Sequence, residues 1–121
     1  MQSIGVDIVE LKRISAIKNK LAFSRKILSE KERKIYTTLK HENRQLEYLA
    51  GRWALKEAIY KAAPKLCKGR SFKDFSILTD QNGAPYLDEA TVKTTGKMML
   101  TLSHSKNYVV AFVVVLATNS N

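Results

Sequence analysis

The chain has 121 residues, of which 45% are hydrophobic and 26% are charged, and these values are ordinary for a single soluble domain spanning residues 1–121. The single cysteine, Cys67, excludes an internal disulfide and a Cys-x-x-Cys metal site, and it favours a reducing compartment. The net charge of +10 favours acidic partners, but it does not distinguish among nucleic acid, an acidic protein and a phosphorylated small molecule.

Nothing in the sequence predicts insertion into a membrane. The longest apolar run, residues 108–117, is far shorter than the roughly 20 residues that a transmembrane helix needs. Residues 1–7 lack the basic start and the apolar stretch of a signal peptide, and they already include a carboxylate. We therefore expect a cytoplasmic protein.

The first part of the chain predicts a strand followed by a basic helical stretch. Residues 4–9 alternate as a strand does, with Ile4, Val6 and Ile8 on one face and the odd-numbered residues on the other. Residues 11–26 are rich in lysine and arginine and carry apolar residues at helical spacing.

Two further helices are predicted next. Ser29 and Glu32 have the spacing of a capping box, which marks a helix start. The strongest helical pattern runs over residues 42–63 and ends before Pro64. Its apolar stripe consists of Leu46, Leu49, Ala50, Trp53 and Ala54.

Strands are predicted after the long helix, over residues 72–79, 84–87, 98–102 and 108–117. Asn82 and Gly83 predict a hairpin between the first two, because both residues tolerate the positive φ of a type I′ turn. The last strand is apolar on both faces, which predicts a central strand or one covered on both sides. The fold class is therefore α+β, with an antiparallel sheet packed against a long helix and shorter helices.

Two carboxylates occur in unusual places. Asp7 interrupts an otherwise apolar strand, and Glu57 extends the apolar stripe of the long helix one turn beyond Trp53. Because burying an unpaired carboxylate costs several kcal/mol, each needs a cation or contact with solvent. Mg²⁺ prefers one or two carboxylates together with water and phosphate oxygens, so the pair predicts a magnesium site, and no His/Cys cluster favours zinc. Two simpler alternatives stay open: a solvent-facing Asp7, and a Glu57–Lys61 ion pair at i,i+4.

Three other polar residues are candidates for phosphate contact. His104, with a hydroxyl residue on each side, is expected in the loop between the last two strands, where it could donate to a phosphate or face solvent. Arg52 and Lys56 are expected on the flank of the long helix away from its apolar stripe, as solvated charges unless a phosphate is held nearby.

Three segments resemble the acyl-carrier-protein synthase type of phosphopantetheinyl transferase. GVDIVELKR at residues 5–13 is similar to the family's GxDxxxxxR opening, GRWALKEAIYKA at 51–62 to its KEAxxKA helix, and TLSH at 101–104 to its SxSH-type loop. The similarity covers nearly the whole chain. The chain departs from the family pattern at Thr101, where a serine is usual, and at residues 63–70, where one glycine and three basic residues replace a Gly-x-Gly turn.

The resemblance implies the 4′-phosphopantetheinyl transferase-like fold and an enzyme, a holo-[acyl-carrier-protein] synthase. Such an enzyme moves the 4′-phosphopantetheine group from coenzyme A to a serine of apo acyl carrier protein, depends on Mg²⁺ and releases 3′,5′-ADP, in support of fatty acid biosynthesis. It further implies two partners, coenzyme A and acyl carrier protein, and a homotrimer with active sites at subunit interfaces. Neither nucleic acid nor a membrane is an expected partner.

The resemblance also implies roles for individual residues. Asp7 and Glu57 would hold magnesium. For the reaction implied in this way, our own candidate to accept the serine proton is Glu57, directly or through a metal-bound water. Lys61 would stabilise charge on the phosphoryl oxygens or protonate the leaving group. Arg13 would contact the carrier protein. The basic residues 11–26 would steer the acidic carrier protein towards this contact. Coenzyme A would be bound by Arg52, Lys61, His104 and, as a weaker candidate, Ser105.

A small RNA-binding domain is the main alternative, because the positive charge is what such a domain requires. The chain lacks the aromatic run and the GXXG loop of common RNA-binding modules, and RNA binding leaves the two carboxylates unexplained. A non-catalytic trimeric scaffold is a weaker alternative. Five questions stay open: the carrier proteins served, the tolerance for acyl-coenzyme A, the preference for Mg²⁺ or Mn²⁺, the ligands contributed by residues 63–70, and whether Glu57 or a metal-bound water is the base.

Overall fold

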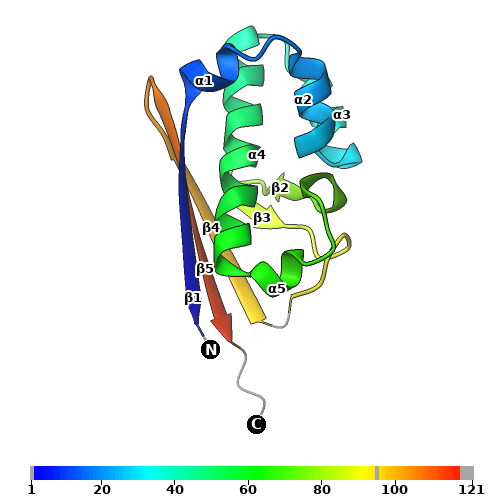
Figure 1. Cartoon of the computed structure of the whole chain (residues 1–121), viewed down its shortest axis with the longest axis vertical. Coiled ribbons are helices and arrows are strands. Elements are labelled where there is room, and N and C mark those ends of the chain that lie inside the picture. Colours follow the sequence, from blue (N-terminus) through cyan, green and yellow to red (C-terminus); the bar gives the residue numbers. More distant parts are fainter. Residues whose placement is uncertain (1, 95, 118–121) are drawn as a thin grey trace.

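The computed structural model describes residues 2–94 and 96–117, in which one long helix lies across a face of an antiparallel sheet, with shorter helices and a small hairpin beside it (Figure 1). The elements are β1 (Ser3–Glu10), α1 (Leu11–Ser15), α2 (Lys20–Ile27), α3 (Glu30–Thr38), α4 (Glu42–Ala62), α5 (Pro64–Cys67), the 3₁₀ helix η1 (Phe72–Asp74), β2 (Ile77–Thr79), β3 (Pro85–Leu87), β4 (Gly96–His104) and β5 (Tyr108–Ala117). The predicted α+β fold is confirmed. Within the described ranges, no helix is both long enough and apolar enough to cross a membrane.

The main sheet has three strands in the order β1–β5–β4, and both strand pairs are antiparallel. The strand predicted over residues 108–117 is confirmed as the central one. Its residues Val109, Ala111 and Val113 face α4 and are fully buried, because the apolar surface of the helix covers this face of the sheet.

Strand β1 approaches the C-terminal half of α4 closely because Gly5 has no side chain. A Cβ atom added to Gly5 would lie 2.0 Å from the main-chain oxygen of Ala58 and 3.0 Å from the main-chain nitrogen of Ala62. The hydroxyl of Ser3 also donates to the main-chain oxygen of Ala62 at 2.6 Å. This contact holds the odd-numbered face of β1, which includes Asp7, against α4.

Helix α4 confirms the prediction over residues 42–63 to within one residue, and it ends where Pro64 begins α5. More of the helix is buried than its apolar stripe predicts, because the sheet covers one side while α2, α3 and the β2–β3 hairpin flank another (Figure 1). The buried residues are Leu49, Ala50, Gly51, Arg52, Ala54, Leu55, Lys56, Ala58, Ile59 and Ala62.

Lys56 is completely buried, so the expectation of a solvated charge was wrong. Its Nζ donates to Oε1 of Glu32 at 2.5 Å, and Glu32 is equally buried. Nζ also donates to the main-chain oxygens of Ile27 (2.9 Å), Phe72 (2.7 Å) and Phe75 (2.9 Å). Burial lowers the pKa of Lys56, and the carboxylate of Glu32 opposes that shift. The ion pair therefore joins α4 to α2, α3 and the segment before β2.

The predicted capping box is present, with Ser29 capping α3 and Glu32 accepting from the main-chain nitrogen of Ser29 at 2.8 Å. The hairpin between β2 and β3 is also present, but its turn is not type I′. Within this turn only Gly83 adopts a positive φ, of 85°, while Oδ1 of Asp80 accepts from the main-chain nitrogens of Asn82 and Ala84. These contacts describe a type I turn followed by a left-handed glycine, a common three-residue hairpin loop.

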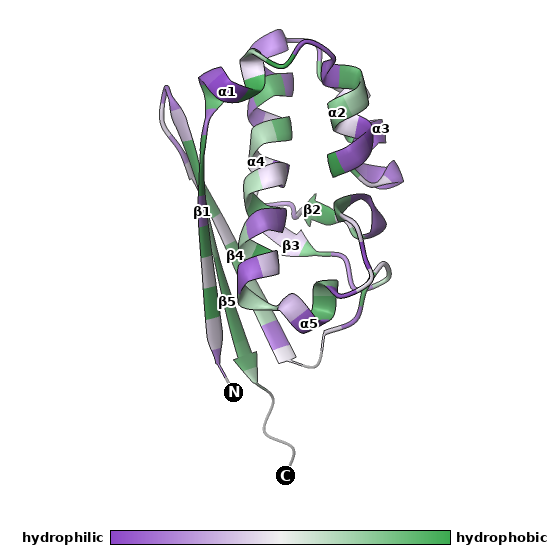
Figure 2. Cartoon of the chain, viewed as in Figure 1, coloured by the Kyte–Doolittle hydropathy of each residue, from purple (hydrophilic) through white to green (hydrophobic). Residues whose placement is uncertain are grey.

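The second face of the main sheet is apolar and exposed. Hydrophobic residues follow β1 and β5 (Figure 2), and the side chains that turn away from α4 include Ile4, Val6, Ile8, Met99 and Phe112. Ile4 and Ile8 are 65% and 62% exposed. The alternation in residues 4–9 is therefore confirmed, but the covered face is the one that carries Gly5 and Asp7.

Candidate functional site

Asp7 lies on the covered face of β1, between the buried residues Gly5 and Val9. Its side chain is only 18% exposed, so the alternative of a solvent-facing Asp7 is wrong. Its Oδ1 accepts from Nζ of Lys61 at 3.2 Å, and Nζ also donates to the main-chain oxygen of Val6 at 2.9 Å. The carboxylate of Asp7 therefore lies where β1 packs against α4, and it is paired with Lys61, whose side chain remains half exposed.

Glu57 is partly buried on α4, one turn before Lys61. Its Oε1 accepts from the indole N–H of Trp53 at 3.1 Å. The i,i+4 ion pair between Glu57 and Lys61 is not formed, because Lys61 pairs with Asp7 instead. Residues four apart are neighbours on a helix surface, so the Lys61–Asp7 contact places Asp7 beside the turn of α4 that carries Glu57.

These carboxylates suit a hard divalent cation. Asp7 and Glu57 provide oxygen ligands, and Mg²⁺ is typically held by one or two carboxylates, with water and substrate phosphate completing its coordination. The described residues contain no group of three or more His, Cys, Asp or Glu side chains that could hold a metal ion. The residues present therefore fit Mg²⁺ in a site that is completed by a substrate.

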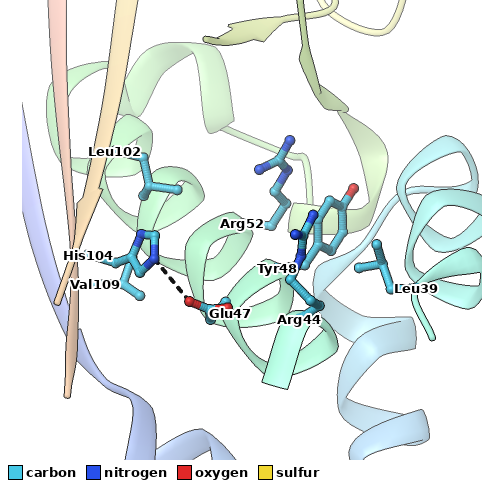
Figure 3. Close-up of a pocket in the computed structure, with 8 residues that line it drawn as sticks. All are labelled: Leu39, Arg44, Glu47, Tyr48, Arg52, Leu102, His104 and Val109. Atoms are coloured by element: carbon cyan, nitrogen blue, oxygen red, sulfur yellow. Dashed lines mark ion pairs between the residues drawn. The ribbon is translucent and has the colours of Figure 1, made fainter. Parts of the chain in front are cut away.

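A cavity of about 300 Å³ lies between α4 and the adjoining ends of β4 and β5 (Figure 3). Its lining residues are Leu39, Arg44, Glu47, Tyr48, Arg52, Leu102, His104 and Val109. His104 is the last residue of β4 and not part of a loop, and its register opposite Val109 turns its ring towards α4. There its Nε2 lies 3.0 Å from Oε2 of Glu47.

Arg52 lines this cavity but is only 5% exposed, so the expectation of a solvated charge was wrong here too. Its Nε donates to the main-chain oxygen of Ile77 at 3.2 Å and its Nη2 to Oγ1 of Thr79 at 2.7 Å. The guanidinium also lies over the ring of Tyr48, at 4.5 Å from the ring centroid. These contacts with β2 use two of the five N–H donors of the guanidinium and fix its orientation.

Tyr48 carries a buried hydroxyl that has no hydrogen-bond partner among the described residues. Burial raises the pKa of Tyr48 to about 12, so the hydroxyl keeps its proton at neutral pH and can donate. Tyr48, Arg44 and Glu47 were all missed in the sequence. The signal that could have found two of them is the four-residue spacing of Arg44, Tyr48 and Arg52, which places the three along one side of α4.

Arg13 and Ser105 belong neither to the group of Asp7, Glu57 and Lys61 nor to the lining of the cavity. Arg13 is exposed on α1, and its guanidinium carbon lies 5.1 Å from the centroid of the Trp53 ring, so it contacts the residue that donates to Glu57. Ser105 begins the β4–β5 turn, and its Oγ accepts from the main-chain nitrogens of Asn107 (3.3 Å) and Tyr108 (3.2 Å). The Ser105 hydroxyl therefore supports the turn.

The segment over residues 63–70 continues from the end of α4 that carries Lys61. It contains α5 (Figure 1). It also contains a turn at Gly69, whose φ is 77°. Lys65 and Lys68 are exposed, while Nη1 of Arg70 donates to the main-chain oxygen of Leu66 at 2.6 Å. The segment thus adds positive charge at the end of α4 where Asp7 and Lys61 meet.

The chain resembles known proteins in both sequence and fold. The sequence profile of the 4′-phosphopantetheinyl transferase superfamily matches residues 3–113. The chain belongs to this superfamily. It is 44% identical over 116 residues to the holo-[acyl-carrier-protein] synthase of Acholeplasma laidlawii, an alignment that covers 94% of this chain and 95% of that protein. It is 38% identical over 120 residues to the synthase of Onion yellows phytoplasma, with coverage of 95% and 94%.

Solved structures place the fold within the same superfamily. The crystal structure of a holo-(acyl-carrier-protein) synthase from Bacillus anthracis, in complex with CoA (3′,5′-ADP), has a TM-score of 0.82 and 39% identity and covers 96% of both chains. The resemblance seen in the three sequence motifs is therefore confirmed, and the chain is a transferase of the holo-[acyl-carrier-protein] synthase type.

Proposed function

We propose that this transferase moves 4′-phosphopantetheine from coenzyme A to a serine of apo acyl carrier protein, in a reaction that requires Mg²⁺ and releases 3′,5′-ADP. The observation that carries the proposal is the placement of Asp7 and Lys61 in contact beside the turn of α4 that bears Glu57. The relatives that match the chain are named holo-[acyl-carrier-protein] synthases, and this name supports the choice of reaction.

The reaction breaks the diphosphate link of coenzyme A. The serine oxygen forms a bond to the phosphorus that carries the pantetheine arm, and the bond from this phosphorus to 3′,5′-ADP breaks. Catalysis of such transfers is largely positioning and electrostatic stabilisation. Magnesium held by Asp7 and Glu57 would supply charge neutralisation at the diphosphate and polarise the attacked phosphorus.

The chain's own residues supply the remaining functions. Glu57, directly or through water, accepts the proton of the attacking serine, since its Oε1 is already oriented by Trp53. Lys61 stabilises the charge on the phosphoryl oxygens, because its half-exposed ammonium is fixed by Asp7 and by the main chain of Val6.

The cavity beside β4 would bind the nucleotide part of coenzyme A. Arg44, Arg52 and His104 bring positive or donating groups to it, and the hydroxyl of Tyr48 is a further donor. The turn hydroxyl of Ser105 is close in sequence to His104 and stays a weaker candidate for this contact. Because α4 carries both Arg52 and Glu57, one rigid helix would set the distance between the nucleotide and the reacting phosphorus.

Intact-mass spectrometry tests the proposed activity. The protein is incubated with apo acyl carrier protein, coenzyme A and Mg²⁺, and we expect each carrier molecule to gain one phosphopantetheine. Omission of coenzyme A, or addition of EDTA, should prevent the gain. An unchanged carrier mass in the complete reaction would refute the proposal.

Carrier-protein docking gives a separate prediction. Acyl carrier proteins are acidic, so Arg13→Glu should raise the KM for the carrier about tenfold through charge repulsion and leave the affinity for coenzyme A within twofold. Lys34→Glu on α3 is the matched control, because Lys34 is 77% exposed and lies on a different helix. Equal weakening of both substrates in the Arg13 variant would contradict a docking role.

We further propose that the protein is a homotrimer with active sites at subunit interfaces. The exposed apolar face of the main sheet supports it, since contiguous apolar patches on soluble proteins mark interaction sites. The occupant that we propose for this face is further copies of the same chain. Asp7 lies on the opposite face of the same strand, so assembly through β1 would occur next to the carboxylates.

Disruption of that face tests the assembly. We expect the wild-type protein to sediment at three times 13.7 kDa and Val6→Glu to sediment at 13.7 kDa, because burying the new carboxylate would cost several kcal/mol. Thr37→Glu, an equally charged change on an exposed position of α3, should leave the trimer intact. A Val6→Glu protein with the wild-type mass would show that this face is not the interface.

We also propose that the whole chain acts as one phosphopantetheinyl transferase domain, in the cytoplasm and in support of fatty acid biosynthesis. One hydrophobic cluster extends through the described elements, and this continuity supports the single domain.

A further inference from the structure

Trp53 contacts both Arg13 and Glu57. Its indole N–H donates to Oε1 of Glu57 at 3.1 Å, and the two residues are one turn apart on α4. The ring of Phe23 from α2 meets the indole edge-to-face, with centroids 5.1 Å apart and an interplanar angle of 80°. The guanidinium of Arg13 from α1 lies 5.1 Å from the indole centroid. Side chains from two further helices therefore pack against the ring, while its N–H alone contacts Glu57.

We propose that Trp53 is a positioning residue whose N–H sets the orientation in which the Glu57 carboxylate receives a divalent cation. This inference rests on the proposed function, which makes Glu57 a metal ligand. A carboxylate has two oxygens and about four lone-pair sites. The indole bond occupies one site on Oε1, opposes rotation of the carboxylate and leaves Oε2 available to the cation.

The expected size of the effect follows from similar arrangements. Hydrogen-bond partners of metal-binding side chains typically change metal affinity or activity by about 10–100-fold when they are removed. Because the Trp53 bond joins a neutral donor to a partly buried carboxylate, we expect the lower end of that range, about tenfold. If Trp53 contributed only by filling space, its replacement by another aromatic residue would not change the metal affinity.

The test compares the N–H group with the ring. Trp53→Phe keeps an aromatic ring beside Phe23 and Arg13 but removes the donor, whereas Phe23→Leu removes packing and keeps the donor. Binding of Mn²⁺ is measured by electron paramagnetic resonance of the free ion, with coenzyme A present and no carrier protein. We expect the dissociation constant for Mn²⁺ to rise about tenfold in Trp53→Phe and to stay within twofold of wild type in Phe23→Leu.

Two further measurements separate positioning from loss of structure. The affinity for coenzyme A without metal should be unchanged in Trp53→Phe. In the transfer assay, the Mg²⁺ concentration that gives half-maximal rate should rise, while the KM for coenzyme A should not. If Trp53→Phe folds poorly, benzothienylalanine at position 53 replaces the N–H by sulfur within a ring of nearly the same shape, and the same tenfold loss is expected.

The outcomes distinguish this inference from the proposed function. Wild-type protein that does not bind Mn²⁺ would overturn the metal site itself. Wild-type binding together with unchanged affinity in Trp53→Phe or in the benzothienylalanine protein would overturn the positioning role alone. Equal losses in Trp53→Phe and Phe23→Leu would overturn it as well, because packing would then account for the effect.

Discussion

Replacement of Glu57 by glutamine is expected to lower the turnover number by about 10³-fold or more while the protein stays folded. Glutamine keeps the shape of the side chain, and its carbonyl oxygen can still accept the N–H of Trp53. It provides no negative charge for a divalent cation and cannot take up the serine proton. General base catalysis alone contributes about 10²–10⁴-fold, and the loss of a metal ligand adds to that factor. Single-turnover mass spectrometry of the carrier protein measures the change.

Glu42→Gln is the matched control for this variant. Glu42 lies on the same helix, in the exposed first turn of α4 and away from Asp7, so its turnover should stay within twofold of wild type. Asp7→Asn should show a loss similar to that of Glu57→Gln, since both carboxylates would bind one ion. A Glu57→Gln protein with near-normal turnover would contradict the assignment of both residues.

Replacement of Lys56 by methionine is expected to lower the free energy of unfolding by about 3–5 kcal/mol, because it leaves the buried carboxylate of Glu32 without its cation. Three main-chain oxygens would lose a donor in the same step. Urea unfolding followed by circular dichroism measures this change. The effect is on stability, since Lys56 points away from the cavity and towards Glu32 and Phe75.

Lys34→Met provides the comparison for the buried lysine. Lys34 is 77% exposed and lies 4.0 Å from Glu30 in an i,i+4 pair, so its replacement should cost no more than about 0.5 kcal/mol. If Lys56→Met unfolded at the same urea concentration as Lys34→Met, the buried ion pair would not contribute to the stability of this fold.

Residue periodicity was sufficient to predict the main elements. The long helix before Pro64, the capping box at Ser29 and the central strand over residues 108–117 all depend on local patterns, and the structure confirms each. Boundaries that depend on irregular backbone were less accurate. The predicted strand over residues 72–79 begins as a 3₁₀ helix and becomes a strand only at Ile77.

The burial of charged residues could not be predicted from spacing along α4. Lys56 is buried because Glu32, 24 residues earlier, meets it together with three main-chain oxygens. Arg52 is buried because β2, 25 or more residues later, supplies two acceptors. Both partners come from elements brought to the helix only by the complete fold, so a helical pattern alone classifies these residues as solvated.

The candidate site also contains both a local contact, which the sequence could predict, and a long-range contact, which it could not. The bond between Trp53 and Glu57 joins residues four apart and could have been inferred from helix geometry. The contact between Lys61 and Asp7 spans 54 residues and depends on the close approach at Gly5. Likewise, alternation in β1 separates an apolar face from the face with Asp7, but it does not reveal which one the helix covers.

We propose that Asp7 and Glu57 bind one divalent ion against the diphosphate of coenzyme A. The most direct test is an anomalous difference map from crystals grown with coenzyme A and Mn²⁺. We expect one strong peak about 2.1 Å from a carboxylate oxygen of each residue and from an oxygen of the diphosphate. A well-ordered diphosphate with Mn²⁺ bound elsewhere, or bound by only one of the two residues, would contradict the claim.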